Sequence, residues 1–348
     1  MRDKLKPLAE RIAQTEAKMR ENALLLRKEN KKISGSPEDR LLLVVQKVPL
    51  SGLSIVAVDS GILADRIHGS DIIIGKPAAV NFVYNNSGLV SCSHFPVKFP
   101  EPQIEIKTGL EEHEALVFRQ LFRLKLEISA AIETLGSFNP NIMLLDGSII
   151  PLGSDRPPAE SSIFPVYSEL IALYLKLFSL CQERNCMLVG VIKDSRGKRL
   201  IDLLALDHLH ISDSYFVNFL LEEAERTAIV SYASEKKKTP VMKDLNEFGE
   251  CISLFYLKSS KTDLPLRIEF LKYENSVSVT SDKSVDWIAS VLLSLCSISK
   301  NFAYPACLIE ADMCAIMNPL EMEGVKKDLF LLSEGSLQEL RRNSRPFR

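Results

Sequence analysis

The chain has 348 residues, of which 46% are hydrophobic and 25% are charged, and its formal net charge is −2. This balance is ordinary for a globular protein with a sizeable core, and it excludes a uniformly basic protein that coats nucleic acid. An acidic metal centre inside a locally basic groove is compatible with it.

The sequence carries no recognisable membrane, secretory or disulfide signature. Its first 33 residues are charged throughout, and no apolar run reaches the roughly 18 residues that span a bilayer. The seven cysteines include no C-x-x-C pair, which is typical of reduced thiols rather than of disulfides or a structural zinc site. We therefore expect a cytoplasmic protein that does not enter a membrane.

The first predicted element is a charged helix over residues 3–33. Its apolar residues recur at helical spacing in a narrow stripe, and Ser34-Gly35-Ser36-Pro37 ends it. Such a stripe packs either on the protein's own body or on a partner, and the pattern leaves both open.

A group of short strands follows this helix. They are predicted at 53–60, 71–74, 78–84 and 88–97. Gly61, Gly75-Lys76-Pro77 and Asn85-Asn86-Ser87-Gly88 separate them as turn signals, so an antiparallel meander is expected.

The remaining chain alternates helices and strands. Helices are predicted at 110–135, 165–184, 214–226, 284–299 and 305–317, and strands at 141–145, 187–192, 251–258 and 265–273. The charge run Glu235-Lys236-Lys237-Lys238 is interpreted as a solvated surface, and the chain after residue 317 as polar and basic. This order predicts a mixed α/β sheet flanked by helices rather than strict βαβ repeats.

Two aspartates end apolar strands. Asp59 closes the strand at 53–60, and Asp146 follows the strand at 141–145 and precedes Gly147-Ser148. Carboxylates at two strand ends could converge at one edge of a sheet, although aspartate also begins turns without any further role. Both interpretations stay open at this point.

Two further charged residues accompany apolar segments. Glu127 lies beside the apolar stripe of the helix at 110–135, where a carboxylate is either at a solvated edge or must be paired or metal-bound. Lys193 ends the strand at 187–192, either as a simple strand end or as a group that stabilises charge on a phosphate. Acids from separate elements suit Mg²⁺ or Mn²⁺, which prefer carboxylate oxygens and promote phosphodiester hydrolysis.

Five short motifs, in order and at matching spacing over roughly 50–320, resemble a known family. They are Ala57-Val58-Asp59-Ser60-Gly61, Arg123-Leu124-Lys125-Leu126-Glu127, Leu144-Leu145-Asp146-Gly147-Ser148, Val191-Ile192-Lys193-Asp194-Ser195, and Tyr304-Pro305 leading to Ala311-Asp312. The family is NurA, a group of archaeal and bacterial DNA-repair nucleases. Each motif is short, and the ordered combination is the specific feature.

The resemblance implies an RNase H-like core in which Asp59, Glu127 and Asp146 bind two Mn²⁺ or Mg²⁺ ions. It also implies 5′–3′ exonuclease and single-strand endonuclease activity on DNA. By the same resemblance, the protein is a homodimer that docks on a HerA-type hexameric ATPase. The pair would resect the ends of DNA double-strand breaks for homologous recombination.

The last motif departs from the family pattern. The family usually carries a histidine ligand in the helix after the Tyr-Pro pair, and here the matching position is Asp312. We predict that Asp312 completes the metal site, because aspartate is a hard ligand for Mn²⁺ or Mg²⁺. Tyr304 matches a family tyrosine that orients the centre. The alternative is a catalytically weak or inactive scaffold that binds the motor or DNA without cutting.

These patterns divide the chain into three predicted parts. Residues 1–36 form an N-terminal charged helix for a partner or dimer contact. Residues 37–330 form the RNase H-like nuclease domain, and residues 331–348 form a basic C-terminal tail.

Overall fold

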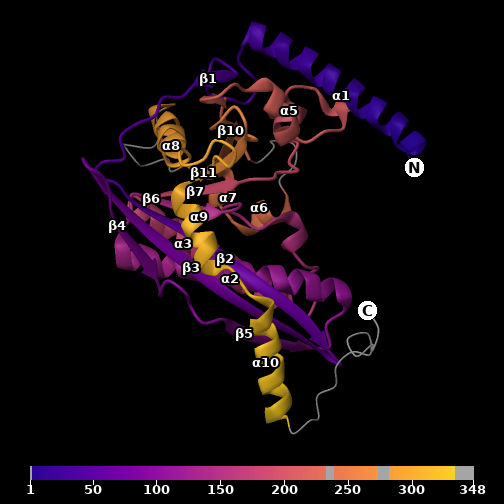
Figure 1. Ribbon diagram of the computed structural model, residues 1–348, viewed down its shortest axis with the longest axis vertical. Coiled ribbons are helices and arrows are strands. Elements are labelled where there is room, and N and C mark those ends of the chain that lie inside the picture. The colour runs from indigo at the N-terminus through magenta and orange to yellow at the C-terminus, as the bar shows by residue number, and fades with distance from the viewer. Residues whose placement is uncertain (1, 233–238, 273–281, 334–348) are drawn as a thin grey trace.

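The computed structural model describes residues 2–232, 239–272 and 282–333, and these form one mixed sheet with helices on both faces (Figure 1). The strands are β1 (Leu42–Val44), β2 (Ser54–Ile67), β3 (Ser70–Asn85), β4 (Gly88–Phe95), β5 (Gln103–Thr108), β6 (Ile142–Asp146), β7 (Met187–Ile192), β8 (Glu225–Thr227), β9 (Val230–Ser231), β10 (Ile252–Lys258) and β11 (Leu266–Leu271). The helices of eight residues or more are α1 (Arg2–Glu29), α2 (Glu112–Phe138), α3 (Phe164–Glu183), α5 (Asp213–Leu220), α8 (Asp282–Leu295), α9 (Ala306–Ala315) and α10 (Pro319–Leu332).

The strand order is β1-β8-β10-β11-β7-β6-β2-β3-β4. Strands β2, β3 and β4 form an antiparallel meander, while β6 pairs parallel to β2, and β7 pairs parallel to β6. A three-strand meander extended by parallel strands beyond its first strand is the RNase H-like connectivity. The remaining strands widen the sheet by antiparallel pairing. The predicted fold class, a mixed sheet flanked by helices with an N-terminal helical extension, is confirmed.

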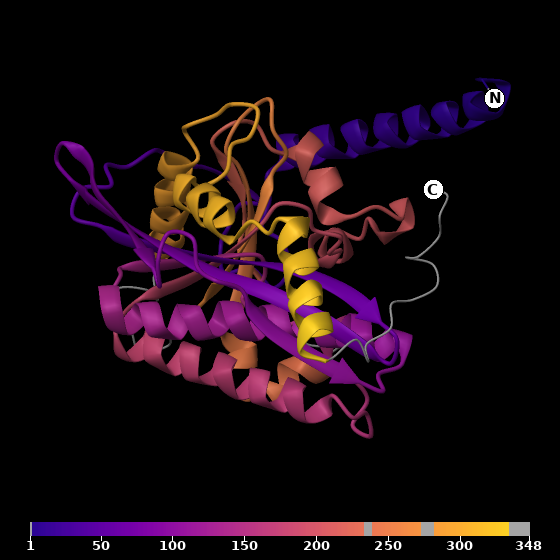
Figure 2. The ribbon, with the colours of Figure 1, turned by 60° about the horizontal axis from the view of Figure 1, so that its bottom comes forward.

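The sheet is buried on both faces, and β2 shows why its sequence is almost continuously apolar. Successive side chains of a strand point to opposite faces. Val56 and Val58 pack with α2 and α3 in one core, whereas Ile55 and Ala57 pack with α8 and α9 in another. Figure 2 shows these two helical layers on opposite sides of the strands.

Helix α1 divides into two parts along its length. Met19 and Ala23 are buried with residues of α5, and Arg27 donates to Glu225 at 2.6 Å. The N-terminal half projects from the body, and its Leu5 and Leu8 are 53% and 52% exposed (Figures 1 and 2). The C-terminal half of the apolar stripe therefore packs on the body of the protein, whereas its N-terminal half is exposed to solvent.

The turn signals predicted inside β2 and β3 do not interrupt these strands. The two strands pair along their whole length, from Ser54↔Val83 to Ile67↔Ser70. Gly61 is needed for close packing, because a Cβ there would clash with the carbonyl oxygen of Ala315. Pro77 lies between the stretches of β3 that pair with β5 and with β4, so neither neighbour requires its missing N–H.

Strand β5 (Gln103–Thr108) was not predicted, and two further segments differ from the sequence-based expectation. The helix predicted at 214–226 ends at Leu220, and residues Glu225–Thr227 form β8. The chain after 317 was described only as polar and basic, with no element predicted there, yet it forms α10, with the Asn318 side chain accepting from the N–H of Leu320 as an N-cap.

The apolar side of α10 explains the second difference. Met322 is buried against Ile67, Ile72 and Ile74 of the β2–β3 hairpin, with Val325 and Leu329 packed beside it, so tertiary contacts stabilise this helix. The charge run at 235–238 and residues 334–348 of the predicted tail lie outside the described residues.

Helix α3 is the one described helix that is long and apolar enough to cross a membrane by length and composition. Its Tyr167, Leu170 and Tyr174 are instead buried in the core with α2.

Candidate metal centre

Three aspartates from separate elements meet at the junction of β2, β6 and α9. Val58 of β2 pairs with Leu145 of β6 in parallel, so Asp59 and Asp146 follow at neighbouring strand positions. Asp312 approaches from α9, which packs across β2 and β3 (Figure 1). One carboxylate oxygen from each of the three aspartates lies within 4.8 Å of the others. The predicted convergence of Asp59 and Asp146 is present, and Asp312 joins them.

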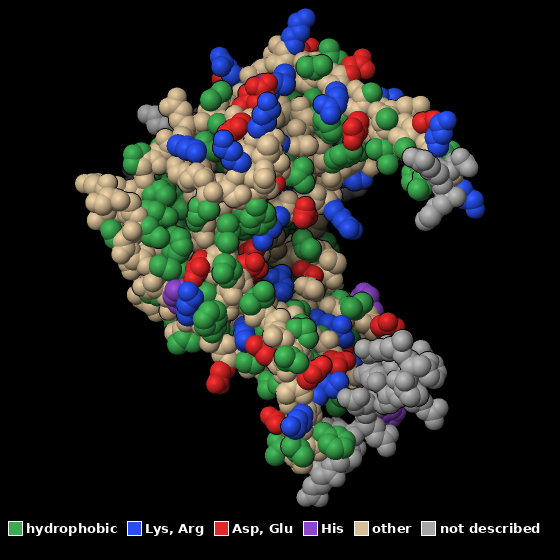
Figure 3. All heavy atoms as spheres, in the orientation of Figure 1, with side chains coloured by type: hydrophobic (Ala, Val, Ile, Leu, Met, Phe, Trp, Pro, Cys, Tyr) green, Lys and Arg blue, Asp and Glu red, His purple; other side chains and the backbone are tan. Residues whose placement is uncertain are grey.

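The three aspartates line a cavity of about 410 Å³ together with Arg123 and the chain after α9. Asp59 is only 8% exposed, whereas Asp312 is exposed, so the cavity opens to solvent on the α9 side. In the space-filling view, the protein is hollowed between α1 and α10, with Lys/Arg and Asp/Glu side chains along the hollow (Figure 3).

Glu127 reaches the centre from the opposite helical layer. Its carboxylate is 2% exposed and accepts from the Ser60 hydroxyl at 3.0 Å and from Arg123 Nη1 at 2.8 Å. Alternation along β2 places Asp59 on the α9 face and Ser60 on the α2 face. Glu127 therefore lies outside the three-aspartate group and is joined to it through Ser60.

Burial and mutual repulsion make it unfavourable for all the carboxylates of the centre to be ionised at once. Burial, followed by the carboxylates of Asp146, Glu127 and Asp312, raises the pKa of Asp59 to about 8, although the N–H of Ser60 opposes the shift. Burial also raises the pKa of Glu127, although Arg123 and Ser60 oppose it. A divalent cation would offset this repulsion, and an all-oxygen carboxylate set is what Mn²⁺ and Mg²⁺ prefer. The residues present therefore fit such an ion.

Both predicted accessory residues contact Asp146. Lys193 Nζ lies 2.9 Å from Asp146 Oδ2, and the Tyr304 hydroxyl lies 2.9 Å from Asp146 Oδ1 and 3.0 Å from the Val191 carbonyl. Burial and then Asp146 raise the pKa of Tyr304 well above its usual value, so this hydroxyl remains a donor. Lys193 and Tyr304 thus each contact a different oxygen of the Asp146 carboxylate, which fixes the orientation of this side chain.

Sequence reasoning missed a support for the loop that follows Asp146. Glu269 of β11 is 1% exposed and accepts from the Ser148 hydroxyl at 2.6 Å and from the Ile149 N–H at 3.3 Å. Arg267 donates to the same carboxylate at 2.9 Å. The spacing of Arg267 and Glu269 places them on one strand face, but only the pairing of β11 with β7 brings Glu269 to this loop.

The fold and the site together define a mixed α/β protein with an RNase H-like core and a cluster of three aspartates that fits a divalent cation. The sequence model of the NurA domain matches residues 53–315, which contain every predicted site residue. The chain belongs to the NurA family.

Solved structures of NurA proteins share this fold. The NurA nuclease from Sulfolobus solfataricus is 18% identical with a TM-score of 0.60, and the alignment covers 93% of each chain. A crystal structure of NurA with manganese is 12% identical with a TM-score of 0.56, over 93% of this chain and 97% of that one. A comparison of the sequence with curated proteins finds no match. The chain thus has the fold of NurA nucleases.

Proposed function

We propose that this protein is a divalent-metal-dependent DNA nuclease. The observation that carries the proposal is the placement of Asp59, Asp146 and Asp312 with their oxygens within 4.8 Å of one another in an open cavity. We assign these three aspartates as metal ligands. The family resemblance adds Glu127 as a further ligand, although its carboxylate now accepts from Ser60 and Arg123 rather than facing the three aspartates. The NurA structure solved with manganese supports Mn²⁺ as the ion, with Mg²⁺ as the alternative.

The bound metal, as two ions, would supply an activated water and charge stabilisation at the phosphate. The chain's own residues have separate tasks. Tyr304 holds the oxygen of Asp146 that Lys193 does not contact, which keeps the carboxylate in one orientation. The side chain of Lys193 is 34% exposed, so its ammonium can also reach a phosphate oxygen and stabilise the charge that develops there.

Arg123 has a task at the boundary between the two layers. It pairs with Glu127 at 2.8 Å and also lines the cavity. Its guanidinium therefore offsets the charge of a buried acid and presents a donor fork on the substrate side, where a phosphate fits bidentately.

The finer parts of the proposal follow the family resemblance. We propose 5′–3′ exonuclease and single-strand endonuclease action in DNA end resection, in the cytoplasm, by a homodimer together with a HerA-type ATPase. The exposed Leu5, Leu8 and Ile12 of α1 support a protein contact, because an apolar stripe that projects from the body needs a partner to cover it.

The nuclease is tested by digestion of end-labelled single- and double-stranded DNA with Mn²⁺, Mg²⁺ or EDTA, with and without the cognate ATPase. We expect metal-dependent cutting by the parent protein and none by Asp59→Asn. Asp39→Asn is the matched control, because the side chain of Asp39 is 92% exposed, pairs with Lys32 and does not line the cavity. Cutting that survives Asp59→Asn would refute the assignment.

One observation favours a second candidate, a non-catalytic scaffold for the motor or DNA. Asp312 stands where the resembling family carries histidine, and it is the exposed member of the centre. A folded parent that binds DNA or the ATPase but cuts nothing under every metal condition would establish the scaffold instead.

A further inference from the structure

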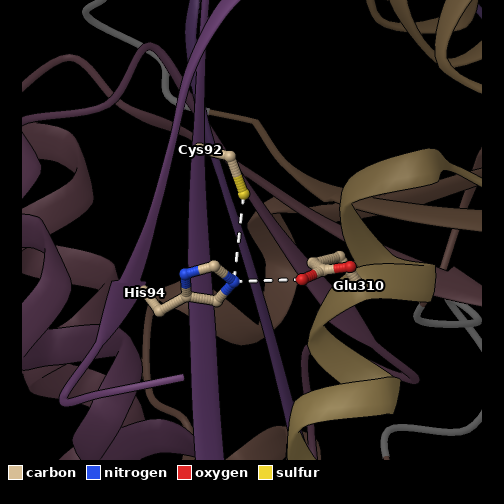
Figure 4. Close-up of side chains that lie close together, drawn as sticks. All are labelled: Cys92, His94 and Glu310. Atoms are coloured by element: carbon tan, nitrogen blue, oxygen red, sulfur yellow. Dashed lines mark hydrogen bonds and ion pairs between the residues drawn. The ribbon is translucent and has the colours of Figure 1, made fainter.

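A second group of metal-ligating side chains lies on the other side of α9 from Asp312. Cys92 and His94 are two positions apart on β4 and therefore project from the same strand face. Glu310 of α9 points at them, and the three side chains converge in Figure 4. This group contains a thiol and an imidazole, so its chemistry differs from that of the aspartate centre.

The distances within this cluster, named here the Cys-His-Glu cluster, suit a small tetrahedral ion. Cys92 Sγ lies 3.9 Å from His94 Nε2, which lies 3.0 Å from Glu310 Oε1, and the three ligand atoms all fall within 4.8 Å. Zinc bonds of about 2.3 Å to sulfur and about 2.0–2.1 Å to nitrogen or oxygen place tetrahedral S···N and N···O pairs about 3.6 Å and about 3.3 Å apart. The S···N and N···O distances therefore each lie about 0.3 Å from the values for a tetrahedral ion.

The surroundings of the cluster allow an ion to enter and then hold it. The side chains of His94 and Glu310 are 17% and 24% exposed, whereas Cys92 is exposed and gives access from solvent. Lys98 Nζ lies 3.3 Å from the same Glu310 oxygen and now balances its charge. The Lys98 side chain is 54% exposed, so it can withdraw into water when a cation takes its place.

We propose that Cys92, His94 and Glu310 bind a zinc-type divalent transition-metal ion, with the fourth position open to solvent. Sulfur and nitrogen ligands select such ions over Mg²⁺ or Ca²⁺. Binding replaces the S–H bond of Cys92 with a sulfur–metal bond, and the thiol proton passes to solvent. The site does not depend on the proposed nuclease activity.

The ion would act as a clip between β4 and α9. Glu310 lies two residues before Asp312 on α9, so a bond from Glu310 to a β4-bound ion fixes the helix that presents Asp312. The sequence expectation of no zinc site rested on the missing C-x-x-C spacing. Here two ligands come from alternate strand positions, and the third lies 216 residues from His94.

The test is a Co²⁺ titration of the full-length, metal-stripped protein. Co²⁺ bound by a thiolate gives a sulfur-to-cobalt charge-transfer band, which carboxylate ligands alone do not give. We expect this band to saturate at one equivalent, to be displaced by Zn²⁺, and to be absent in Cys92→Ser. His94→Gln and Glu310→Gln should each weaken cobalt binding by about tenfold or more.

Two controls separate this site from the rest of the chain. Cys251→Ser removes a thiol of α7 (Phe248–Cys251), outside the cluster, and should keep the band. Asp59→Asn disables the aspartate centre and should also keep it, so the failure of one site is distinguishable from the failure of the other. A parent without a thiolate band, or a band that persists in Cys92→Ser, would overturn the proposal.

Discussion

Glu269 offers the sharpest test of how the fold supports the candidate centre. Its carboxylate is 1% exposed and neutralises Arg267, which is itself 7% exposed. Arg267 Nε and Nη2 lie 2.9 and 2.7 Å from Glu269 Oε1 and donate to it. The other carboxylate oxygen, Oε2, accepts hydrogen bonds from the Ser148 hydroxyl and the Ile149 N–H. Glu269→Gln removes the charge but keeps the size, so the guanidinium of Arg267 is left buried without its counter-ion.

Loss of one partner from a buried ion pair costs about 3–5 kcal/mol, because the remaining charge is uncompensated. We therefore expect Glu269→Gln to lower the free energy of unfolding by about this amount in urea denaturation. The double variant Arg267→Met/Glu269→Gln should lose clearly less, since neither charge then remains buried. If the single variant is as stable as the parent, or if the double variant is the less stable of the two, the reasoning is refuted.

Three further predictions concern packing, protonation and the N-terminal helix. Gly61→Ala should lower the free energy of unfolding by about 1–3 kcal/mol in thermal denaturation, because the new Cβ would clash with α9. Gly136→Ala should raise it by about 0.5–1 kcal/mol, because Gly136 lies inside α2 and its new Cβ would meet no atom within 4 Å. Folding raises the pKa of Asp59 from 3.8 to about 8, so between these pH values the folded state binds the proton more tightly than the unfolded state. The free energy of unfolding of the metal-free protein should therefore fall as the pH rises from about 4 to about 8. Asp59→Asn should flatten this dependence of stability on pH, and an unchanged slope would contradict the assignment. Met19→Ala should cost about 2–5 kcal/mol because Met19 is 0% exposed, while Leu8→Ala in the exposed half of α1 should leave the melting temperature within error of the parent.

The convergence of Asp59 and Asp146 could be predicted, but the reason given for Asp59 was wrong. Asp146 is the last residue of β6, whereas Asp59 lies inside β2, which continues to Ile67. The parallel pairing of β2 with β6 still brings the two carboxylates together, because Val58 pairs with Leu145. Glu127 was also identified as a carboxylate beside a buried stripe. Its partner Ser60 was not, because that contact depends on which face of β2 meets α2.

The errors arose where a local signal competes with tertiary packing. Gly61 and Pro77 are turn signals by composition, yet both lie inside the long antiparallel pairing of β2 with β3. Glycine is required at position 61 because the backbone there packs closely against Ala315 of α9, about 250 residues away along the chain. Helix α10 was missed because its stripe is weak without the β2–β3 hairpin that Met322 covers. The Cys-His-Glu cluster was invisible to spacing rules because β4 and α9 meet only in the folded state.

The most direct test of the central claim is the Mn²⁺-dependent cleavage rate of Asp312→Ala compared with Asp312→His. If Asp312 is a metal ligand, histidine can replace it as a nitrogen donor and should retain cutting. Alanine removes the donor and should reduce the rate by about a hundredfold or more, with Asp39→Asn unchanged. Equal rates for the parent and Asp312→Ala would contradict the account, because the three-aspartate centre would then not be the place where the phosphodiester bond is cut.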